Sequence, residues 1–394
     1  MRIAHIITRL IIGGAQENTL LCCEDLINLF GEDVLLITGP PLGPEGSLVD
    51  RAIRNRVPLK IIPWLRREIH PWRDLRSYWA IRRVLQVFRP DVVHTHSAKG
   101  GILGRLAAYR LRVPVIVHTV HGAPFHPYQH FVAREFCRLA EVWAARYCDI
   151  FITVANAMRT LLVQGSIAPP EKCITIYSGM EIEPFVNCGT YRQETRRKLG
   201  FSADEVVVGK VARLFPLKGH DDVIEAAGPV IAQNPKVRFL FVGGGILEND
   251  LKKKIQDKGL ADYFAFTGLI PPEKLPAVIS AMDILVHTSL REGLARVLPQ
   301  ALLAGIPVIS YDVDGAREVV IPEKTGILLP ARDVAGLASA ILRLAQDPAI
   351  RRQFGEAGRL LCQEIFPHEK MTREIHALYC KLLRSKGYRV DMVG

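Results

Sequence analysis

Short apolar runs alternate with stretches of helical period along most of the chain. In the first half, β-branched runs of about six residues lie at 2–7, 33–38, 91–96, 115–120 and 149–155. Between these runs, apolar residues recur every three or four positions, as they do along one face of a helix. The alternation predicts a parallel sheet covered by helices.

A second set of apolar runs follows a polar interval, residues 178–205, in which no apolar strand is found. The further runs lie at 206–212, 237–243, 263–268, 283–288, 307–312 and 325–330. We therefore expect an α/β chain of two successive domains, with the boundary near 183–190. After Pro367 the pattern is that of a separate amphipathic helix.

Composition agrees with two domains and argues against a membrane-spanning or disulfide-bonded chain. The 394 residues, 49% of them hydrophobic, are enough for more than one core. No stretch approaches the ~18–20 apolar residues of a spanning helix, and Arg9 with Gly13 and Gly14 ends the opening run, which predicts a strand and not a signal peptide. The eight cysteines form no C-x-x-C pair, so we expect neither a zinc site nor disulfides, and a reducing cytoplasm suits them.

The net charge of +11 is concentrated in one segment of the first domain. From Arg51 to Arg112 there are fifteen Lys or Arg against three acids, and Trp64, Trp72 and Trp79 lie among the arginines. This mixture is typical of a surface that contacts an anionic membrane. The alternative is an ordinary helix whose arginines face solvent while Trp79, Val84, Leu85 and Phe88 pack inward. Nucleic acid is not expected, because no recognition motif accompanies the charge.

Ligands of open parallel sheets bind at the carboxyl ends of the strands, so the loops there carry the candidate residues. Gly13 and Gly14 follow the first strand and precede a helix, where backbone N–H groups can approach an anion. A tight turn is the alternative. The loop is not the dinucleotide fingerprint G-x-G-x-x-G, and the stretch 243–249 fails it too, because Glu248 replaces the last glycine.

His121 ends another strand and stands beside Gly122, which places it well for a ligand. His118 lies three residues earlier and could suggest a metal pair. Residues 118 and 121 of a strand point to opposite faces of the sheet, however, so the two cannot share one ion without a turn between them. We expect His121 to meet the substrate.

Arg213 follows a strand of the second domain, and Lys218 comes five residues later, before a helix that starts near Asp221. Two cations on one strand-to-helix turn suit a pyrophosphate, because a guanidinium forks onto oxygens and an ammonium adds a point charge.

Glu292 and Gln300 lie eight residues apart around the start of a short helix expected near Ala295. Such a helix would separate them by roughly 12 Å, a span that suits a ligand with a sugar at one end and a ribose at the other. The N–H groups of Gly293, Leu294, Ala295 and Arg296 would face a diphosphate between them. The alternative is a helix-terminal charge at Glu292 and a solvent-facing Gln300.

Several of these motifs together resemble family 4 of the retaining glycosyltransferases. They are "GGAQ", "HTHSAKGGILGRLAA" and "TVHG" in the first domain, and "VGKVARLFPLKGHDD", "FLFVGGG" and "SLREGLARVLPQALLAGIPV" in the second. The resemblance runs to about residue 380 and implies the GT-B fold, two Rossmann-like domains facing across a cleft. It implies an acceptor-binding domain at 1–185, a nucleotide-sugar-binding domain at 186–368, and a final helix, 369–394, that crosses back to the first.

The resemblance also implies residue roles. Arg213 and Lys218 would hold the donor diphosphate, Gly14 would back the phosphates, Glu292 would touch the transferred sugar and His121 would border it. Where the family's E-x7-E motif has a second glutamate, this chain has Gln300, whose amide oxygen can still accept a hydrogen bond from the ribose. Ala295 replaces a frequent glycine, and Pro299 removes an N–H and would kink the helix.

The reaction that the resemblance implies is retaining hexosyl transfer from a nucleotide-sugar to a hydroxyl acceptor, with the leaving phosphate taking the acceptor proton. We expect a UDP-sugar, a lipid-linked or polysaccharide-precursor acceptor, and no metal or other cofactor, because two cations already face the diphosphate. The alternatives are a nucleotide-sugar epimerase, a sugar phosphorylase, and a catalytically weakened binding protein. We expect a cytoplasmic protein, peripheral on the inner face of the membrane through residues 51–112. The sugar, the acceptor and the oligomeric state are not fixed by the sequence.

Overall fold

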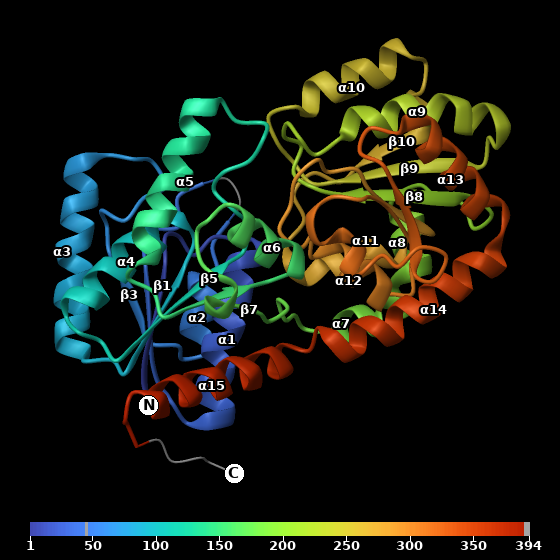
Figure 1. Ribbon diagram of the computed structural model, residues 1–394. Helices are drawn as coiled ribbons and strands as arrows, with labels where there is room; N and C mark the ends of the chain where they lie inside the picture. The colour runs from blue at the N-terminus through green and yellow to red at the C-terminus, as the bar shows by residue number, and fades with distance from the viewer. Residues whose placement is uncertain (44–45, 390–394) are drawn as a thin grey trace. The chain divides into compact units, whose positions relative to one another are not determined.

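A computed structural model describes residues 1–43 and 46–389 of the chain (Figure 1). The chain divides into two compact units, the first made of Met1–Met180 together with the chain from Pro367 onward, the second of Glu181–Phe366. The sequence placed these boundaries a few residues later, after 185 and after 368. Each unit is an α/β domain with its own parallel sheet.

The first unit has a seven-stranded sheet in the order β3-β2-β1-β4-β5-β6-β7. Its strands are β1 (Arg2–Ile7), β2 (Asp33–Thr38), β3 (Leu59–Ile61), β4 (Val92–His96), β5 (Val115–Val120), β6 (Ile150–Thr153) and β7 (Cys173–Thr175). Its helices are α1 (Gly14–Phe30), α2 (Val49–Arg54), α3 (Pro71–Phe88), α4 (Ala98–Arg110), α5 (Phe131–Ala145), α6 (Asn156–Gln164) and α15 (His368–Ser385).

The second unit has a six-stranded sheet in the order β10-β9-β8-β11-β12-β13. Its strands are β8 (Val206–Val211), β9 (Val237–Val242), β10 (Phe264–Phe266), β11 (Ile284–His287), β12 (Val308–Tyr311) and β13 (Gly326–Leu329). Its helices are α7 (Glu183–Val186), α8 (Arg192–Lys198), α9 (His220–Gln233), α10 (Glu248–Asp257), α11 (Leu275–Ser280), α12 (Val297–Leu303), α13 (Val334–Gln346) and α14 (Pro348–Ile365).

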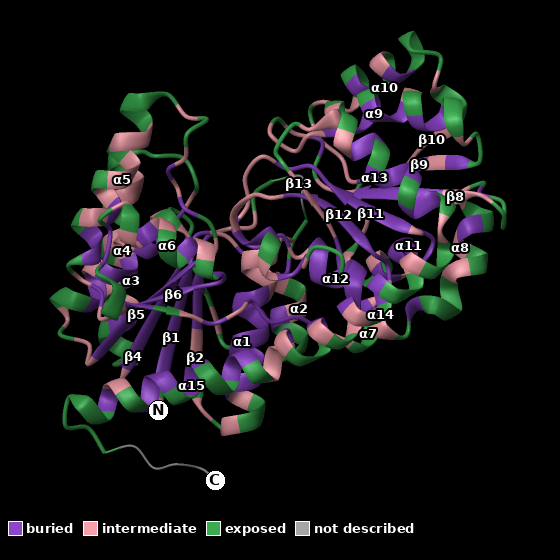
Figure 2. Ribbon diagram, turned by 45° about the vertical axis from the view of Figure 1, so that its right-hand side comes forward, coloured by how far each residue is buried: buried purple, intermediate pink, exposed green. Residues whose placement is uncertain are grey.

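Both sheets are covered on both faces by packed helices, which is why their central strands read as mainly apolar runs. On β1, Ile3 and Ile7 pack toward one cluster of buried residues, while Ala4 and Ile6 pack toward another on the opposite face. The first of these clusters includes residues of α1 and α15, and the second includes residues of α3 and α4. Figure 2 shows the central strands of both sheets as mostly buried.

The strand order reverses once in each sheet, between β1 and β4 in the first and between β8 and β11 in the second. In open parallel sheets, ligands bind outside the carboxyl ends of the strands at such a reversal. We therefore expect ligand-binding residues in the loops that follow β1, β4, β8 and β11.

Helix α15 packs on α1 within the first unit (Figure 1). His368 Nδ1 lies 2.8 Å from a carboxylate oxygen of Asp25, and His376 Nε2 lies 2.7 Å from one of Glu32. Tyr379 is fully buried, and its hydroxyl is hydrogen-bonded to His94 of β4. The last helix thus completes the core of the first unit.

Two strands and one side chain differ from the sequence prediction. β3 and β7 were missed because Lys60 and Thr175 interrupt their three-residue apolar runs, whereas β10, an equally short edge strand, was predicted from its two phenylalanines. Trp79 was offered as an inward-packing residue of a solvated helix, yet 53% of it is exposed, whereas Leu85 of the same helix is buried. Among the described residues, no helix has both the length and the apolar character needed to cross a membrane.

Candidate functional site

The loops after β8 and β11, at the reversal of the second sheet, bring two of the predicted residues together. Lys218 lies on the loop from β8 to α9 and Glu292 on the loop from β11 to α12. The Lys218 Nζ donates to Glu292 Oε1 over 2.5 Å, and both side chains are about one-fifth exposed. A cation and an anion therefore meet where the fold places its ligand.

The backbone around Lys218 has a conformation that glycine makes accessible. Gly219 has φ +66°, and a Cβ there would lie 2.0 Å from the carbonyl oxygen of Thr288 at the end of β11. Leu217, on the other side of Lys218, also has a positive φ of 68°. The loop is consequently held against the end of β11, which fixes Lys218 beside Glu292.

Glu292 is ionised in this setting. Burial alone would raise the pKa of Glu292. The Lys218 ammonium, together with His287 and a hydrogen bond from Ser289, more than offsets this effect, so the pKa is lowered. The backbone N–H of Glu292 donates to Asp314 Oδ2 over 2.6 Å, which orients the loop. The arrangement holds a carboxylate and an ammonium ready for a polar ligand.

Lys210 is a residue that the sequence reasoning missed. It is fully buried on β8, and its Nζ donates to Thr288 Oγ1 over 2.8 Å. The same hydroxyl donates to the carbonyl oxygen of Gly219 over 2.6 Å, so Lys210 supports the loop that carries Lys218. Burial, aided by the charge of Lys218, lowers the pKa of Lys210 to about 7. The available signal was a lysine inside the apolar run 206–212.

His287, at the end of β11, was missed as well. Its Nε2 lies 3.6 Å from Glu292 Oε1. Burial lowers the pKa of His287 to about 3, so the imidazole is neutral and does not form an ion pair with Glu292. Lys218 is therefore the charge partner of Glu292 in this contact.

The short helix after Glu292 differs from the expectation. α12 begins at Val297 and not near Ala295, so Gly293, Leu294, Ala295 and Arg296 lie in the loop before it. With seven residues, α12 is too short to support the helix-terminal anion site that was expected. The N–H groups of residues 293–296 can therefore contact a ligand only as loop amides and not as the end of a helix.

Gln300 and Pro299 lie in α12 and both are buried, which removes the alternative of a solvent-facing Gln300. Pro299 is the third residue of the helix, where an N–H has no intrahelical acceptor. The expected kink therefore has no physical cause.

Arg213 lies on the same loop as Lys218 but is exposed, with its guanidinium carbon 5.1 Å from the ring centroid of Phe215. Behind this loop pass Gly243 and Gly245, where a Cβ would come within 2.2 Å of the Ala212 oxygen and 2.3 Å of the Leu214 oxygen. The glycine run is thus explained by close backbone contact with the Arg213 loop.

The remaining predicted residues belong to the first unit. Gly13 precedes α1 and Gly14 is its first residue; both are half-buried. His121 follows β5, and its Nε2 lies 3.1 Å from His96 Nδ1. His118 is buried and hydrogen-bonded to Thr95, so the two histidines of the β5 segment have different partners.

A sequence of the form D-x-D that the sequence reasoning missed is present at Asp312-Val313-Asp314, and neighbouring carboxylates can bind a metal ion. Asp312 is paired with Arg317, and Asp314 accepts from the backbone of Glu292. Burial raises the pKa of Asp314. Both carboxyl groups therefore already have protein partners.

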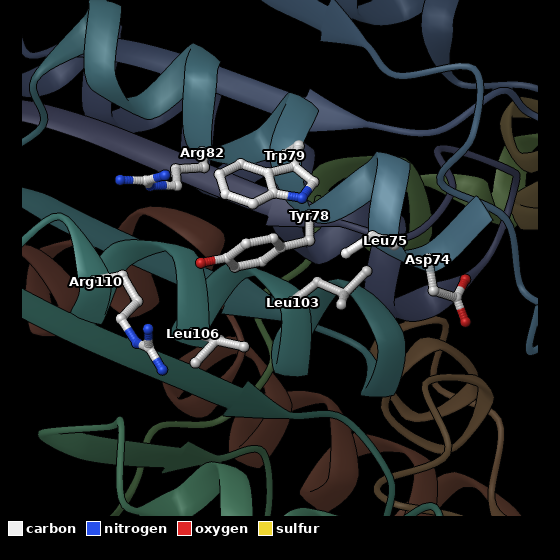
Figure 3. A pocket seen from close by; sticks show the side chains of 8 residues that line it. All are labelled: Asp74, Leu75, Tyr78, Trp79, Arg82, Leu103, Leu106 and Arg110. Carbon is white, nitrogen blue, oxygen red and sulfur yellow. The ribbon is translucent and has the colours of Figure 1, made fainter. Parts of the chain in front are cut away.

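A pocket of about 660 Å³ lies between α3 and α4 of the first unit (Figure 3). Trp79, Tyr78, Leu75, Leu103 and Leu106 form its apolar part. Arg82 and Arg110 border it, with the Arg82 guanidinium carbon 5.1 Å from the Trp79 ring centroid. The basic segment of the sequence thus exposes an apolar pocket with cations at its margin.

Two Rossmann-like units, with a lysine–glutamate pair at the strand reversal of the second, are the features expected of a glycosyltransferase of GT-B fold. Residues 191–361 match the family described as "Glycosyl transferases group 1", and residues 13–179 match "Glycosyl transferase 4-like domain". The chain belongs to this family, the family 4 glycosyltransferases, and is a glycosyltransferase.

Known proteins similar to the chain are named as glycosyltransferases. The "UDP-Gal:alpha-D-GlcNAc-diphosphoundecaprenol alpha-1,3-galactosyltransferase" of Escherichia coli is 30% identical over 356 residues, 89% of each chain. The putative glycosyltransferase EpsD of Bacillus subtilis is 28% identical over 313 residues, 76% of this chain and 78% of its own. An epimerase, a phosphorylase or a non-catalytic binding protein is not favoured by these relatives.

A solved structure shares the fold. Anabaena HepE, crystallised with UDP and glucose, superposes with a TM-score of 0.81 at 22% identity, covering 96% of this chain and 99% of its own. At this identity the likeness concerns the fold.

Proposed function

We propose that this glycosyltransferase moves a hexose from a UDP-sugar to a hydroxyl of a lipid-linked sugar, with retention of the anomeric configuration. The observation that carries the proposal is the Lys218–Glu292 pair at the strand reversal of the second sheet. The choice of UDP and of a lipid-linked acceptor is supported by the name of the E. coli relative, and UDP also by that of the Anabaena structure.

In this proposal the second unit binds the donor. Lys218 and the exposed guanidinium of Arg213 contact the diphosphate, where their charges stabilise the leaving group. Loop amides of Gly293, Leu294 and Ala295 add N–H donors. Glu292 accepts hydrogen bonds from hydroxyls of the transferred sugar, and Gln300 contacts the ribose through its amide.

Residues of the first unit take part as well. His121 borders the transferred sugar, and Gly13 and Gly14 allow the backbone to approach the phosphates. These residue roles rest on position in the fold and on the family resemblance.

Retention is proposed without a covalent intermediate. In this proposal Glu292 is the carboxylate that faces the sugar, and it is paired with Lys218. We therefore assign no second carboxylate to act with it in a double displacement, which would require two. The acceptor hydroxyl attacks the anomeric carbon from the side of the departing diphosphate. The C–O bond to the diphosphate breaks as the new C–O bond forms, and a leaving phosphate oxygen takes the acceptor proton.

No metal ion or other cofactor is assigned a role in this mechanism. The developing charge on the diphosphate is balanced by the two cationic side chains.

The acceptor side is assigned to the first unit and to the inner face of a membrane. Trp79, Arg82 and Arg110 border the α3–α4 pocket, and Trp72 of α3 is 72% exposed. Exposed tryptophan together with arginine suits the interface of an anionic bilayer. A protein held there would meet a lipid-linked acceptor in the plane of the membrane.

The proposal is tested by assaying purified full-length protein with UDP-galactose, UDP-glucose, UDP-N-acetylglucosamine and GDP-mannose. The acceptor probe is synthetic N-acetylglucosamine α-linked through diphosphate to a long alkyl chain. We expect turnover with a UDP-sugar and a product whose new linkage is α by NMR coupling constants. A β linkage contradicts retention, turnover only with GDP-mannose contradicts the base, and donor conversion that requires no acceptor indicates an epimerase.

A further inference from the structure

A line of histidine side chains runs through the first sheet and ends at His121. His5 on β1, His96 on β4 and His121 after β5 lie on neighbouring strands in the order β1-β4-β5. His5 Nδ1 is 3.0 Å from His96 Nε2, and His96 Nδ1 is 3.1 Å from His121 Nε2. The three rings are joined by two hydrogen bonds in series.

The pleat of the sheet explains why these side chains meet. Side chains two residues apart on a strand share a face, so His94 and His96 of β4 point to the same side, and His5 is paired in register with His94. The facing cluster contains Ile3 and Val92 together with residues of α1 and α15. The histidine line therefore lies inside the core at the strand reversal.

The buried members of the line are neutral. Burial lowers the pKa of His5 to about 3, and it lowers the pKa of His96 well below its usual value, helped by the neighbouring His94 and His5. A neutral imidazole carries one N–H, so His96 donates one of its two hydrogen bonds and accepts the other. The two bonds must run in the same direction along the line.

The surroundings of His5, at the opposite end of the line from His121, select the direction of the two hydrogen bonds. His5 is fully buried, and among the described residues its Nε2 has no hydrogen-bond partner. If the bonds ran from His121 to His5, this nitrogen would carry a buried N–H without an acceptor, which native structures rarely contain. If they run from His5 to His121, it carries only a lone pair.

We infer that His5 and His96 are positioning residues that fix the tautomer of His121, with its Nε2 accepting from His96 and its proton on Nδ1. His121 then presents a fixed N–H donor, and not a base, on the ring edge that faces away from His96. Resting on the proposed function, this donor is directed at an oxygen of the transferred sugar.

The end of β4 is held in place in a way that suits such a role. Ser97 directly follows His96 and has φ 60° and ψ 161°, a strained conformation nearly restricted to glycine. Its hydroxyl is 2.7 Å from Thr8 Oγ1 and accepts the Thr8 backbone N–H. The strained residue is thus tied to the end of β1, which keeps His96 beside His5.

The alternative interpretation is a metal site formed by His5, His94 and His96, because nitrogens of these three residues all lie within 4.8 Å of one another. Both ring nitrogens of His94 are already bonded, one to the Tyr379 hydroxyl and one to the Thr119 hydroxyl. Both nitrogens of His96 are bonded as well. A metal would have to displace these bonds, so the hydrogen-bonded line is the better account.

The direct test is the tautomer itself, measured by long-range ¹H–¹⁵N correlation on full-length protein labelled in its histidine rings. The His121 signals are assigned by their loss in His121→Ala. We expect an unprotonated Nε2 and a protonated Nδ1 in the wild type, unchanged in the control His118→Leu, whose ring lies outside the line. A protonated Nε2 on neutral His121 overturns the inference, and the wild-type spectrum alone decides it.

Two variants separate positioning from simple structural support. His96→Leu removes the donor to His121, whereas His96→Asn retains an N–H near the position of Nδ1. We expect kcat with the UDP-galactose and synthetic-acceptor pair to fall about three- to tenfold in His96→Leu, the value of one hydrogen bond, and to recover in His96→Asn with little change in KM. Equal losses in both variants overturn the inference.

The remaining outcomes concern the metal and the proposed function. Stoichiometric metal by elemental analysis that disappears in His5→Leu overturns the hydrogen-bonded line. Full activity of His121→Ala beside the expected wild-type tautomer refutes the role of His121 in catalysis but supports the tautomer assignment. Failure of the two inferences is thereby distinguishable.

Discussion

At the strand reversal of the first sheet lie buried histidines, whereas the loops at the reversal of the second sheet hold a lysine and a glutamate. The first set, His5, His94 and His96, is neutral and hydrogen-bonded. In the second set, Lys218 and Glu292 form an ion pair. The two sheets share the order of their central strands, so the fold provides the position while the side chains decide the chemistry.

Both units bury a cationic side chain, and in the first unit it is Arg105 of α4, which is paired with Glu141. The units differ in which cations lie near their proposed ligands. The basic residues of the first unit that border a pocket, Arg82 and Arg110, are on the outside of α3 and α4. The second unit has Lys210 fully buried on a central strand. Charge near the sheet suits a diphosphate, and charge on an outer helix pair suits a membrane surface.

The substitution with the largest expected effect is Lys218→Ala, which tests whether the charge at the reversal of the second sheet acts on the donor. Removing a cation that stabilises the leaving diphosphate is expected to lower kcat/KM about 100- to 1000-fold. The assay uses the UDP-sugar that supports turnover in the donor screen. The matched control is Lys252→Ala, an exposed lysine of the same unit paired with Glu248 at 2.6 Å. Equal, small effects of both changes would remove Lys218 from the donor site.

A second change tests the outer charge of the first unit. Replacing Arg82 and Arg110 by glutamine is expected to weaken binding to vesicles rich in anionic lipid by about 2 kcal/mol, roughly thirtyfold, at about 1 kcal/mol for each arginine. Co-sedimentation measures it. The control carries Arg197→Gln and Lys253→Gln, exposed residues of the second unit. If the control weakens binding equally, the α3–α4 surface is not the membrane contact.

A third change concerns the buried charge. The folded-state pKa of Lys210 is about 7, below its ordinary 10.5, so between these values the unfolded chain binds more protons and stability rises with pH. Lys210→Met abolishes this contribution. We expect the wild type to gain stability relative to Lys210→Met from pH 7 toward pH 10, in urea unfolding monitored at several pH values. A difference that does not vary with pH would place the Lys210 pKa at its ordinary value.

The smallest expected effect is that of chelation. Because cationic side chains are assigned to the diphosphate, activity should survive prolonged EDTA treatment and dialysis. Complete loss, restored by a divalent cation, would mean that donor binding requires a metal and that Lys218 and Arg213 do not suffice.

The α/β class and eleven of the described strands could be predicted from the sequence because most of their residues are apolar and buried. β3 and β7 could not, since each is three residues long and contains a polar residue, Lys60 or Thr175, whereas the equally short β10 shows two phenylalanines. Lys218 and Glu292 were found because each follows a strand.

The residues that support them were harder to find. Lys210 and His5 lie inside apolar runs, and their roles depend on which strands become neighbours, which a local pattern does not report. The start of α12 was placed two residues early because no capping residue in the sequence marks where the loop 293–296 ends and the helix begins.

Helix α15 also determines the order in which the protein can be completed during synthesis. Met371, Ile375 and Tyr379 belong to the core of the first unit, yet they leave the ribosome after the whole of Glu181–Phe366. Domains fold as units when their segments have emerged. The second unit can therefore complete its folding first. Part of the core of the amino-terminal unit stays exposed until the last helix has been synthesised.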